Sequence, residues 1–135
     1  MVFFWRKSSE KRSVNMAVLA EIQRLRIVAM AHKEWWDGCM TKKDTNYALI
    51  PFSHPVYSKQ ARNIGLLNQG IVANAVKFYG WVDFLNAFQA TRPAYIEAGE
   101  EKRGEFDQRY AKSLRDFLHA FENTFENDFK KLAGK

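Results

Sequence analysis

The residue types that catalyse reactions are few in this sequence, and they do not form a familiar catalytic spacing. Cys39 and His32 are the one nucleophile–base pair that a single element could carry. Their seven-residue spacing places them on one helical face, about two turns apart, which is too far for proton transfer from the thiol to the imidazole. A glycine-rich phosphate loop and a nucleophile elbow are both absent from the sequence. We therefore expect a protein that is not an enzyme; joint burial of Glu21, Asp83 and His119 inside the bundle would indicate an enzyme of another type.

Metal-binding residues are also scattered. A metal site in a helical bundle typically uses Glu-x-x-His pairs on two helices. Here His119 precedes Glu122 by three residues, which is the reverse order, and no second copy of the pair occurs. Glu126 and Asp128 then extend an acidic helix face that is typical of a solvated surface. We expect neither a metal nor a cofactor.

The adjacent pair Trp35-Trp36 is the most distinctive local feature of the sequence. Neighbouring helical residues point about 100° apart, so both rings are buried only where the helix end is embraced on two sides. One interpretation is a cap on the core, beneath a loop that contains Tyr47 and Phe52. The other is contact with a protein partner, because tryptophan is enriched at interfaces. We take Trp35 and Trp36 as candidate partner-binding residues, and the core interpretation stays open.

The first twelve residues combine an aromatic cluster with a basic one. Phe3, Phe4 and Trp5 come first, and they are followed by four basic residues, Arg6, Lys7, Lys11 and Arg12. This order resembles the cytoplasmic end of a membrane helix, where an apolar run ends in an interfacial tryptophan and a basic stop. Five apolar residues are too few to span a bilayer. The segment is therefore the end of a longer membrane helix, a short interfacial anchor, or an ordinary helix end that packs on the domain.

Composition indicates one globular domain. The chain has 135 residues, of which 47% are hydrophobic and 27% charged, with eleven Phe, four Trp and one Cys. A single cysteine excludes an intrachain disulfide. The net charge of +6 is uneven, because residues 93–135 carry eight basic and nine acidic side chains and the excess lies upstream. The basic residues are spread over several elements and do not form a stripe, so the sequence gives no specific signal for nucleic acid.

Apolar spacing predicts helices throughout. A first long helix is expected over 13–40, with Gly38 as a stop. Its inner stripe is expected to comprise Val14, Val18, Ile22, Leu25 and Ala29, widened by Ala17, Leu19, Ile27, Val28 and Met30, while Glu21, Arg24 and Arg26 are expected to be polar positions. After a polar loop at 41–54, Ser53 is expected to cap a short helix from Pro55 to Gly65. A third helix is expected over 69–90. The last carries a continuous helical-period stripe of Phe106, Tyr110, Leu114, Phe117, Phe121, Phe125 and Phe129.

These elements predict an all-α fold, a small four-helix bundle-like domain with three long helices and one short one. We divide the chain into a basic and aromatic membrane-proximal segment at 1–12 and one helical bundle domain at 13–135. The stretch after Pro93 is expected to break or kink the chain and to be partly helical.

Two stretches resemble an uncharacterised family of bacterial proteins. They are the run Ala17-Val-Leu-Ala-Glu-Ile-Gln-Arg-Leu25, and Pro55-Val-Tyr57 with Ala61, Ile64-Gly-Leu-Leu67, Val76, Phe78 and Tyr79. The family has one N-terminal membrane helix, a basic juncture and a small cytoplasmic helical domain. The resemblance covers residues 3 to about 90 and implies a topology but no activity. The chain departs from the family by lacking the full membrane span.

Taken together, these features favour a non-enzymatic, membrane-proximal accessory or interaction protein at the cytoplasmic face of a bacterial membrane. Its expected partners are a membrane surface, a membrane protein or another protein. The alternative is a helical bundle that binds an apolar ligand between its aromatic side chains. A continuous internal cavity would favour the alternative, and a filled core would count against it.

Overall fold

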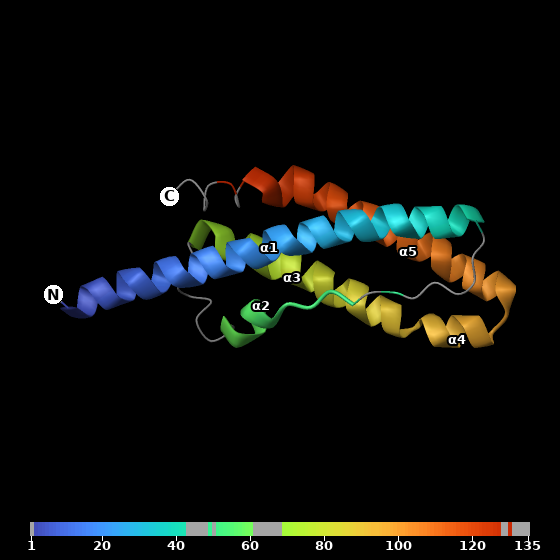
Figure 1. Ribbon diagram of the computed structural model, residues 1–135, viewed down its shortest axis with the longest axis horizontal. Helices are drawn as coiled ribbons and strands as arrows, with labels where there is room; N and C mark the ends of the chain where they lie inside the picture. Colours follow the sequence, from blue (N-terminus) through green and yellow to red (C-terminus); the bar gives the residue numbers. More distant parts are fainter. Residues whose placement is uncertain (1, 43–48, 50, 61–68, 128–129, 131–135) are drawn as a thin grey trace.

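The computed structural model is all-α over the residues that it describes, namely 2–42, 49, 51–60, 69–127 and 130. Side chains are described for these residues except 2–11, 39–42, 60, 69–71 and 124. Three long helices, α1 (Val2–Lys42), α3 (Gln69–Ala90) and α5 (Glu100–Ala120), form the bundle in Figure 1. The predicted all-α, bundle-like fold is therefore confirmed.

Three short elements complete the chain. Helix α2 (Pro55–Gln60) packs against α1, and α4 (Arg92–Glu97) packs against α5. Helix α5 passes without interruption into a π-helical turn, η2 (Phe121–Phe125), which contacts α3. The break predicted near Pro93 is present as a turn at Thr91 between α3 and α4.

The core is largely aromatic and joins the three long helices. On α5 and η2 the predicted stripe from Phe106 to Phe125 is buried, while Phe129 lies outside the described residues. On α1 the predicted inner stripe is also buried, comprising Val14, Val18, Ile22, Leu25 and Ala29. Ring contacts such as Phe78 with Phe117, at 5.4 Å between centroids, join α3 to α5. Large rings that interlock in this way account for much of the burial that stabilises the bundle.

Helix α1 begins at Val2 and not at residue 13, and two further expectations for it were wrong. Gly38 does not end the helix, which continues to Lys42, because a glycine without a left-handed backbone only weakens a helix. Ile27 and Met30 do not widen the buried stripe, because both are exposed on the outer side of α1. The predicted end of the second helix at Gly65 lies outside the described residues.

The turn between α4 and α5 depends on one glycine. Gly99 has φ = 109° and ψ = 173°, a conformation that is strained for any residue with a Cβ. Its backbone lets the chain reverse within two residues, so that α4 folds back beside α5 (Figure 1). A side chain at this position would therefore be strained even though the space around it is open.

Candidate functional site

The N-terminal segment forms the first turns of α1 rather than a separate element. Residues 2–12 are helical and continuous with the rest of α1, and they extend past the end of the bundle in Figure 1. Of the predicted membrane-proximal residues, Arg12 is exposed. The side chains of Phe3, Phe4, Trp5, Arg6, Lys7 and Lys11 lie outside the described ones. No helix within the described ranges is long and apolar enough to cross a membrane.

The structure separates the two candidate partner-binding tryptophans. Trp36 is fully buried, and its indole N–H donates a hydrogen bond to the backbone carbonyl of Asp107 at 3.1 Å. The guanidinium of Arg92 lies over the Trp36 ring, 5.6 Å from its centroid. Trp35 is 40% exposed and stacks on His32 at 5.8 Å. Because Trp36 belongs to the core, only Trp35 retains a surface that a partner can contact.

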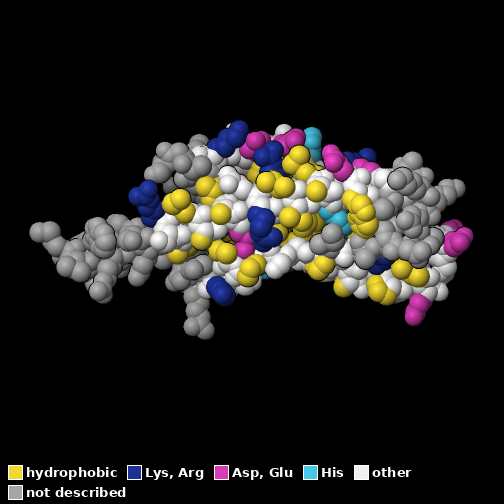
Figure 2. All heavy atoms as spheres, viewed as in Figure 1, with side chains coloured by type: hydrophobic (Ala, Val, Ile, Leu, Met, Phe, Trp, Pro, Cys, Tyr) yellow, Lys and Arg dark blue, Asp and Glu magenta, His cyan; other side chains and the backbone are white. Residues whose placement is uncertain are grey.

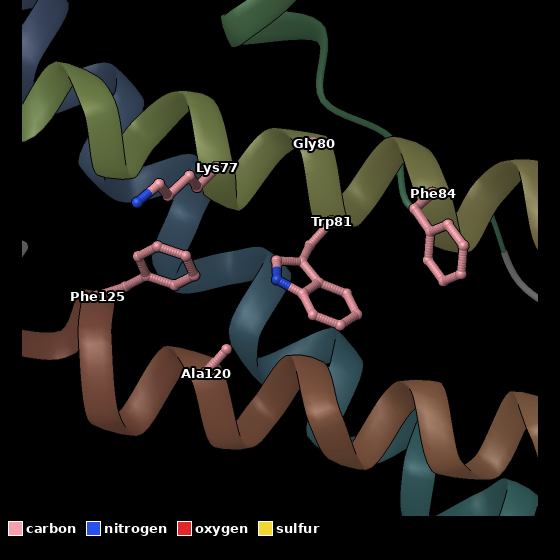
Figure 3. Close-up of a pocket in the computed structure, with 6 residues that line it drawn as sticks. All are labelled: Lys77, Gly80, Trp81, Phe84, Ala120 and Phe125. Carbon is pink, nitrogen blue, oxygen red and sulfur yellow. The ribbon is translucent and has the colours of Figure 1, made fainter.

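An open apolar groove lies between α3 and the end of α5, with a volume of about 530 Å³. Gly80, Trp81 and Phe84 line it from α3, and Ala120 and Phe125 line it from α5 and η2 (Figure 3). Gly80 and Ala120 leave room between the helices, and a Cβ added at Gly80 would meet no atom within 4 Å. The volume lies within the range of about 300–1,000 Å³ that is typical of ligand pockets. Because the groove is open and two helices line it, it lies at the surface and not inside the aromatic core.

Among the described residues, one charged side chain lines this groove. Lys77 extends from α3 at the end where Phe125 forms the floor (Figure 3). Among the described residues, no carboxylate forms an ion pair with Lys77. Phe84, farther along α3, is 48% exposed. The groove thus combines an apolar floor with one cation at its end, which is suited to a molecule with an apolar body and a negative head.

A buried carboxylate joins α1 to the start of α2. Glu21 is 4% exposed and accepts backbone N–H bonds from Val56 at 2.7 Å and Tyr57 at 3.0 Å, together with the Tyr79 hydroxyl at 2.8 Å. Burial and the hydrogen bond to Glu21 both raise the pKa of Tyr79. Glu21 therefore takes the capping role that the sequence assigned to Ser53, whose carbonyl instead accepts a hydrogen bond from Arg24 at 2.7 Å.

Beside this carboxylate, Ser58, His54 and Asp83 form a hydrogen-bonded row. His54 Nε2 lies 2.7 Å from Asp83 Oδ1, and His54 Nδ1 lies 3.1 Å from Ser58 Oγ. The same hydroxyl donates to the His54 carbonyl at 3.0 Å, as serines in helices often do. A serine, histidine and aspartate in a row are also the residue types of an acyl-transfer triad. Such a site needs free N–H donors for an oxyanion, and the N–H groups of Val56 and Tyr57 already donate to Glu21. We therefore assign the row a structural role, in which it joins the start of α2 to α3.

A second buried polar cluster surrounds His32 on α1. His32 Nε2 lies 3.0 Å from the Tyr110 hydroxyl, which also accepts a hydrogen bond from the Gln89 side chain at 2.6 Å. Burial lowers the pKa of His32, and burial raises the pKa of Tyr110. Because aromatic rings enclose the imidazole on several sides, it is held neutral within the core.

The remaining sequence candidates for chemistry do not converge. The side chain of Cys39 lies outside the described ones, so its pairing with His32 stays untested. Glu21 is buried, but Asp83 and His119 are exposed, so these three groups do not form an internal polar site. Among the described residues, no group of three or more His, Cys, Asp or Glu side chains is arranged to hold a metal ion.

Sequence reasoning did not identify the groove. Its small residues, Gly80 and Ala120, lie forty positions apart on different helices, so no local spacing connects them. The one local signal in the sequence is Gly80, because a glycine within a helix permits the close approach of a neighbouring helix. No protein-family model, curated protein or solved structure matches this chain. The fold and the surface geometry therefore carry the functional argument.

Proposed function

We propose that this protein is a non-enzymatic, membrane-proximal accessory protein at the cytoplasmic face of a bacterial membrane, bound to the bilayer surface through its N-terminal segment. The observation that carries the proposal is the continuity of α1, which holds residues 2–12 in a helix beyond the end of the bundle (Figure 1). Apolar and basic residues placed there can reach a surface without disturbing the core.

The chemistry of the segment supports this assignment. It has three aromatic residues at positions 3–5, and then four basic residues and one acidic residue, Glu10, before position 13. Each lysine or arginine near an anionic leaflet contributes about 1 kcal/mol of attraction, and aromatic side chains anchor at the interface. Neither contribution alone gives stable anchoring, but the two together form the pair of signals that peripheral proteins commonly use.

The test is co-sedimentation with anionic and neutral vesicles. We expect the quadruple variant Arg6→Glu, Lys7→Glu, Lys11→Glu and Arg12→Glu to lose binding to anionic vesicles. A matched control reverses four exposed basic residues of α5, Lys102, Arg109, Lys112 and Arg115, and changes the net charge equally. The control is expected to retain most of the binding. Equal loss in both variants would show that overall charge, and not the N-terminal segment, drives the association.

The α3–α5 groove supports a second candidate function, the binding of a single-chain amphiphile with an anionic head. Lys77 would contact the head, while Trp81, Phe84 and Phe125 would cover the chain. This is the apolar-ligand alternative, with the ligand moved from the core to the surface. A membrane-proximal position would supply such a molecule from the bilayer.

Charge preference tests the second candidate. We expect a fatty-acid anion such as laurate to bind the native protein more tightly than decyltrimethylammonium in calorimetric titrations. Lys77→Glu should reverse that preference, whereas Lys112→Glu, an exposed lysine outside the groove, should leave it unchanged. If neither amphiphile binds, or if both variants behave alike, the groove is not a site for this class of ligand.

A further inference from the structure

The side of α1 that faces away from the bundle carries an apolar stripe that is exposed among the described residues. Met16, Ile27 and Met30 are 61%, 67% and 48% exposed. They are joined on the same face by Ala20 and Gln23, which are also exposed. The successive steps along the stripe are four, three, four and three residues, which is the seam spacing of a helix that packs against another helix. Figure 2 shows hydrophobic side chains at intervals along this face.

The arginines beside the stripe are bound within their own chain. Arg24 donates to the carbonyl of Ser53 at 2.7 Å, so it is drawn toward α2. Arg26 lies 3.9 Å from Glu126, and its guanidinium sits 5.1 Å from the centroid of the Phe121 ring. Both cations are therefore held to the sides, and they leave the apolar stripe open along its length.

The charges at the two ends of the stripe are complementary. Arg12 lies one turn before Met16, and Glu34 lies one turn after Met30. Both are exposed, and neither forms an ion pair with a described residue. A single helix cannot bring these two charges together, because about 33 Å of helix separates them at a rise of 1.5 Å per residue.

The ends of the stripe are placed symmetrically about Gln23, whereas Ala20 and Ile27 lie three and four residues from it. Met16 and Met30 each lie seven residues from Gln23, and Arg12 and Glu34 each lie eleven residues from it. Seven and eleven residues are close to two and three whole helical turns. One face of α1 therefore carries Arg12, Met16, Gln23, Met30 and Glu34. An antiparallel copy of the same helix, with the two-fold axis beside Gln23, therefore places Met16 opposite Met30 and Arg12 opposite Glu34.

We propose that the outer face of α1 docks on the same face of a second copy of this chain, as an antiparallel pair of helices related by a two-fold axis at Gln23. The methionines and Ile27 form the apolar seam, and the polar Gln23 pair sets the register. The two Arg12–Glu34 pairs close the ends and exclude the parallel arrangement, in which like charges would face each other.

This proposal does not depend on membrane binding, although it constrains it. An antiparallel dimer has its two N-terminal segments at opposite ends, so both reach one membrane only when the dimer lies along the surface. The triple variant Arg6→Glu, Lys7→Glu and Lys11→Glu keeps Arg12, so it should lose most of the vesicle binding and leave the α1 pairing intact. Vesicle co-sedimentation and the oligomeric state therefore fail separately.

The first test is a site-directed cross-link, made in the Cys39→Ser background so that one thiol is present. In the proposed register Gln23 lies opposite Gln23 of the second copy. The Gln23→Cys variant should therefore oxidise rapidly to a disulfide-linked dimer. The matched control is Gln108→Cys, an exposed glutamine on α5, which should remain largely monomeric under the same oxidation. Equal cross-linking of both variants, or no cross-linking of Gln23→Cys, would overturn the proposed register.

The second test exchanges the end charges and measures the dimer dissociation constant by analytical ultracentrifugation. We expect Arg12→Glu alone and Glu34→Arg alone each to weaken the dimer about tenfold, because each places like charges opposite one another at both ends. The double exchange should restore the native dissociation constant, a result that a folding defect cannot produce. A monomeric native protein, or a double variant as weak as the single ones, would refute the pairing.

Discussion

The two parts of α1 are one continuous helix, but they are maintained by different surroundings. Residues 14–36 face Phe and Tyr side chains and bury Glu21, His32 and Trp36. Residues 2–12 extend past the bundle and carry four basic side chains. The comparison shows that one helix can combine a part fixed by tertiary contacts with a part free to contact a separate surface. Substitutions at the buried positions of the first part should change stability, and those in the second should change membrane association.

Trp36 should give the largest effect on the buried side of this comparison. Trp36→Ala removes a fully buried ring, its contact with Tyr110 at 5.1 Å and the hydrogen bond to Asp107. We expect the free energy of unfolding to fall by about 3–5 kcal/mol, as for other large-to-small core changes. Urea denaturation of Trp35→Ala is the matched control, with an expected loss below about 1 kcal/mol. Similar losses in both variants would contradict the separate environments of the two rings.

Glu21 tests whether a charged acceptor fixes α2 to α1. In Glu21→Gln the amide N–H₂ would face at least one of the backbone N–H donors of Val56 and Tyr57, so a buried donor loses its acceptor. We expect a loss of about 2–3 kcal/mol in the free energy of unfolding. Glu122→Gln, an exposed glutamate near the end of α5, should change it by less than about 0.5 kcal/mol. Equal stability of Glu21→Gln and the native protein would show that this carboxylate is not needed for capping.

A substitution at Gly38, near the end of α1, should raise stability. It lies inside the helix, and a Cβ there would meet no atom within 4 Å. Gly38→Ala should raise the free energy of unfolding by about 0.5–1 kcal/mol, because alanine favours the helix and restricts the unfolded chain. The opposite outcome is expected for Gly99→Ala, since its φ of 109° is strained for alanine. Thermal unfolding of the two variants measures both signs.

His32 should make stability depend on pH. Burial lowers the pKa of His32 from 6.5, so the folded protein favours the neutral ring and the unfolded chain binds the proton first. The contribution of neutral His32 to the free energy of unfolding is therefore complete above pH 6.5. It is lost as the pH falls through 6.5 toward the lower pKa of the folded state. His32→Gln should flatten the fall in urea midpoint on acidification, whereas His119→Gln, at an exposed site, should not. If the urea midpoint of His32→Gln fell with pH as steeply as that of the native protein, His32 would not be the source of the pH dependence.

Periodic patterns predicted the parts of the fold that repeat along one helix. The stripe from Phe106 to Phe125 and the inner face from Val14 to Ala29 were both identified from spacing, because a buried helix face repeats every three or four residues. Contacts between distant segments were not predicted. Glu21 looked like one of several polar positions on α1, yet it caps α2 from 35 residues away. A local rule assigned that cap to Ser53, since serine is a common capping residue and Ser53 lies two positions before the helix start.

The surface features were harder to predict from the sequence for the same reason. The tryptophan pair was recognised as unusual, but only the packing against α5 decides that Trp36 is inside and Trp35 partly outside. Ile27 and Met30 were assigned to the core side of α1, because both are apolar and composition alone does not give the side that a neighbour covers. The groove required two helices to be placed side by side before Gly80 and Ala120 could form one surface.

The most direct test of the central claim, membrane association through the N-terminal part of α1, uses the native protein. Co-sedimentation is measured against vesicles of phosphatidylglycerol and phosphatidylcholine and against phosphatidylcholine alone, at low and high salt. The account predicts binding to the anionic vesicles at low salt, release at high salt through screening of the basic side chains, and little binding to neutral vesicles. Absence of binding to the anionic vesicles, or equal binding to both compositions, would contradict it.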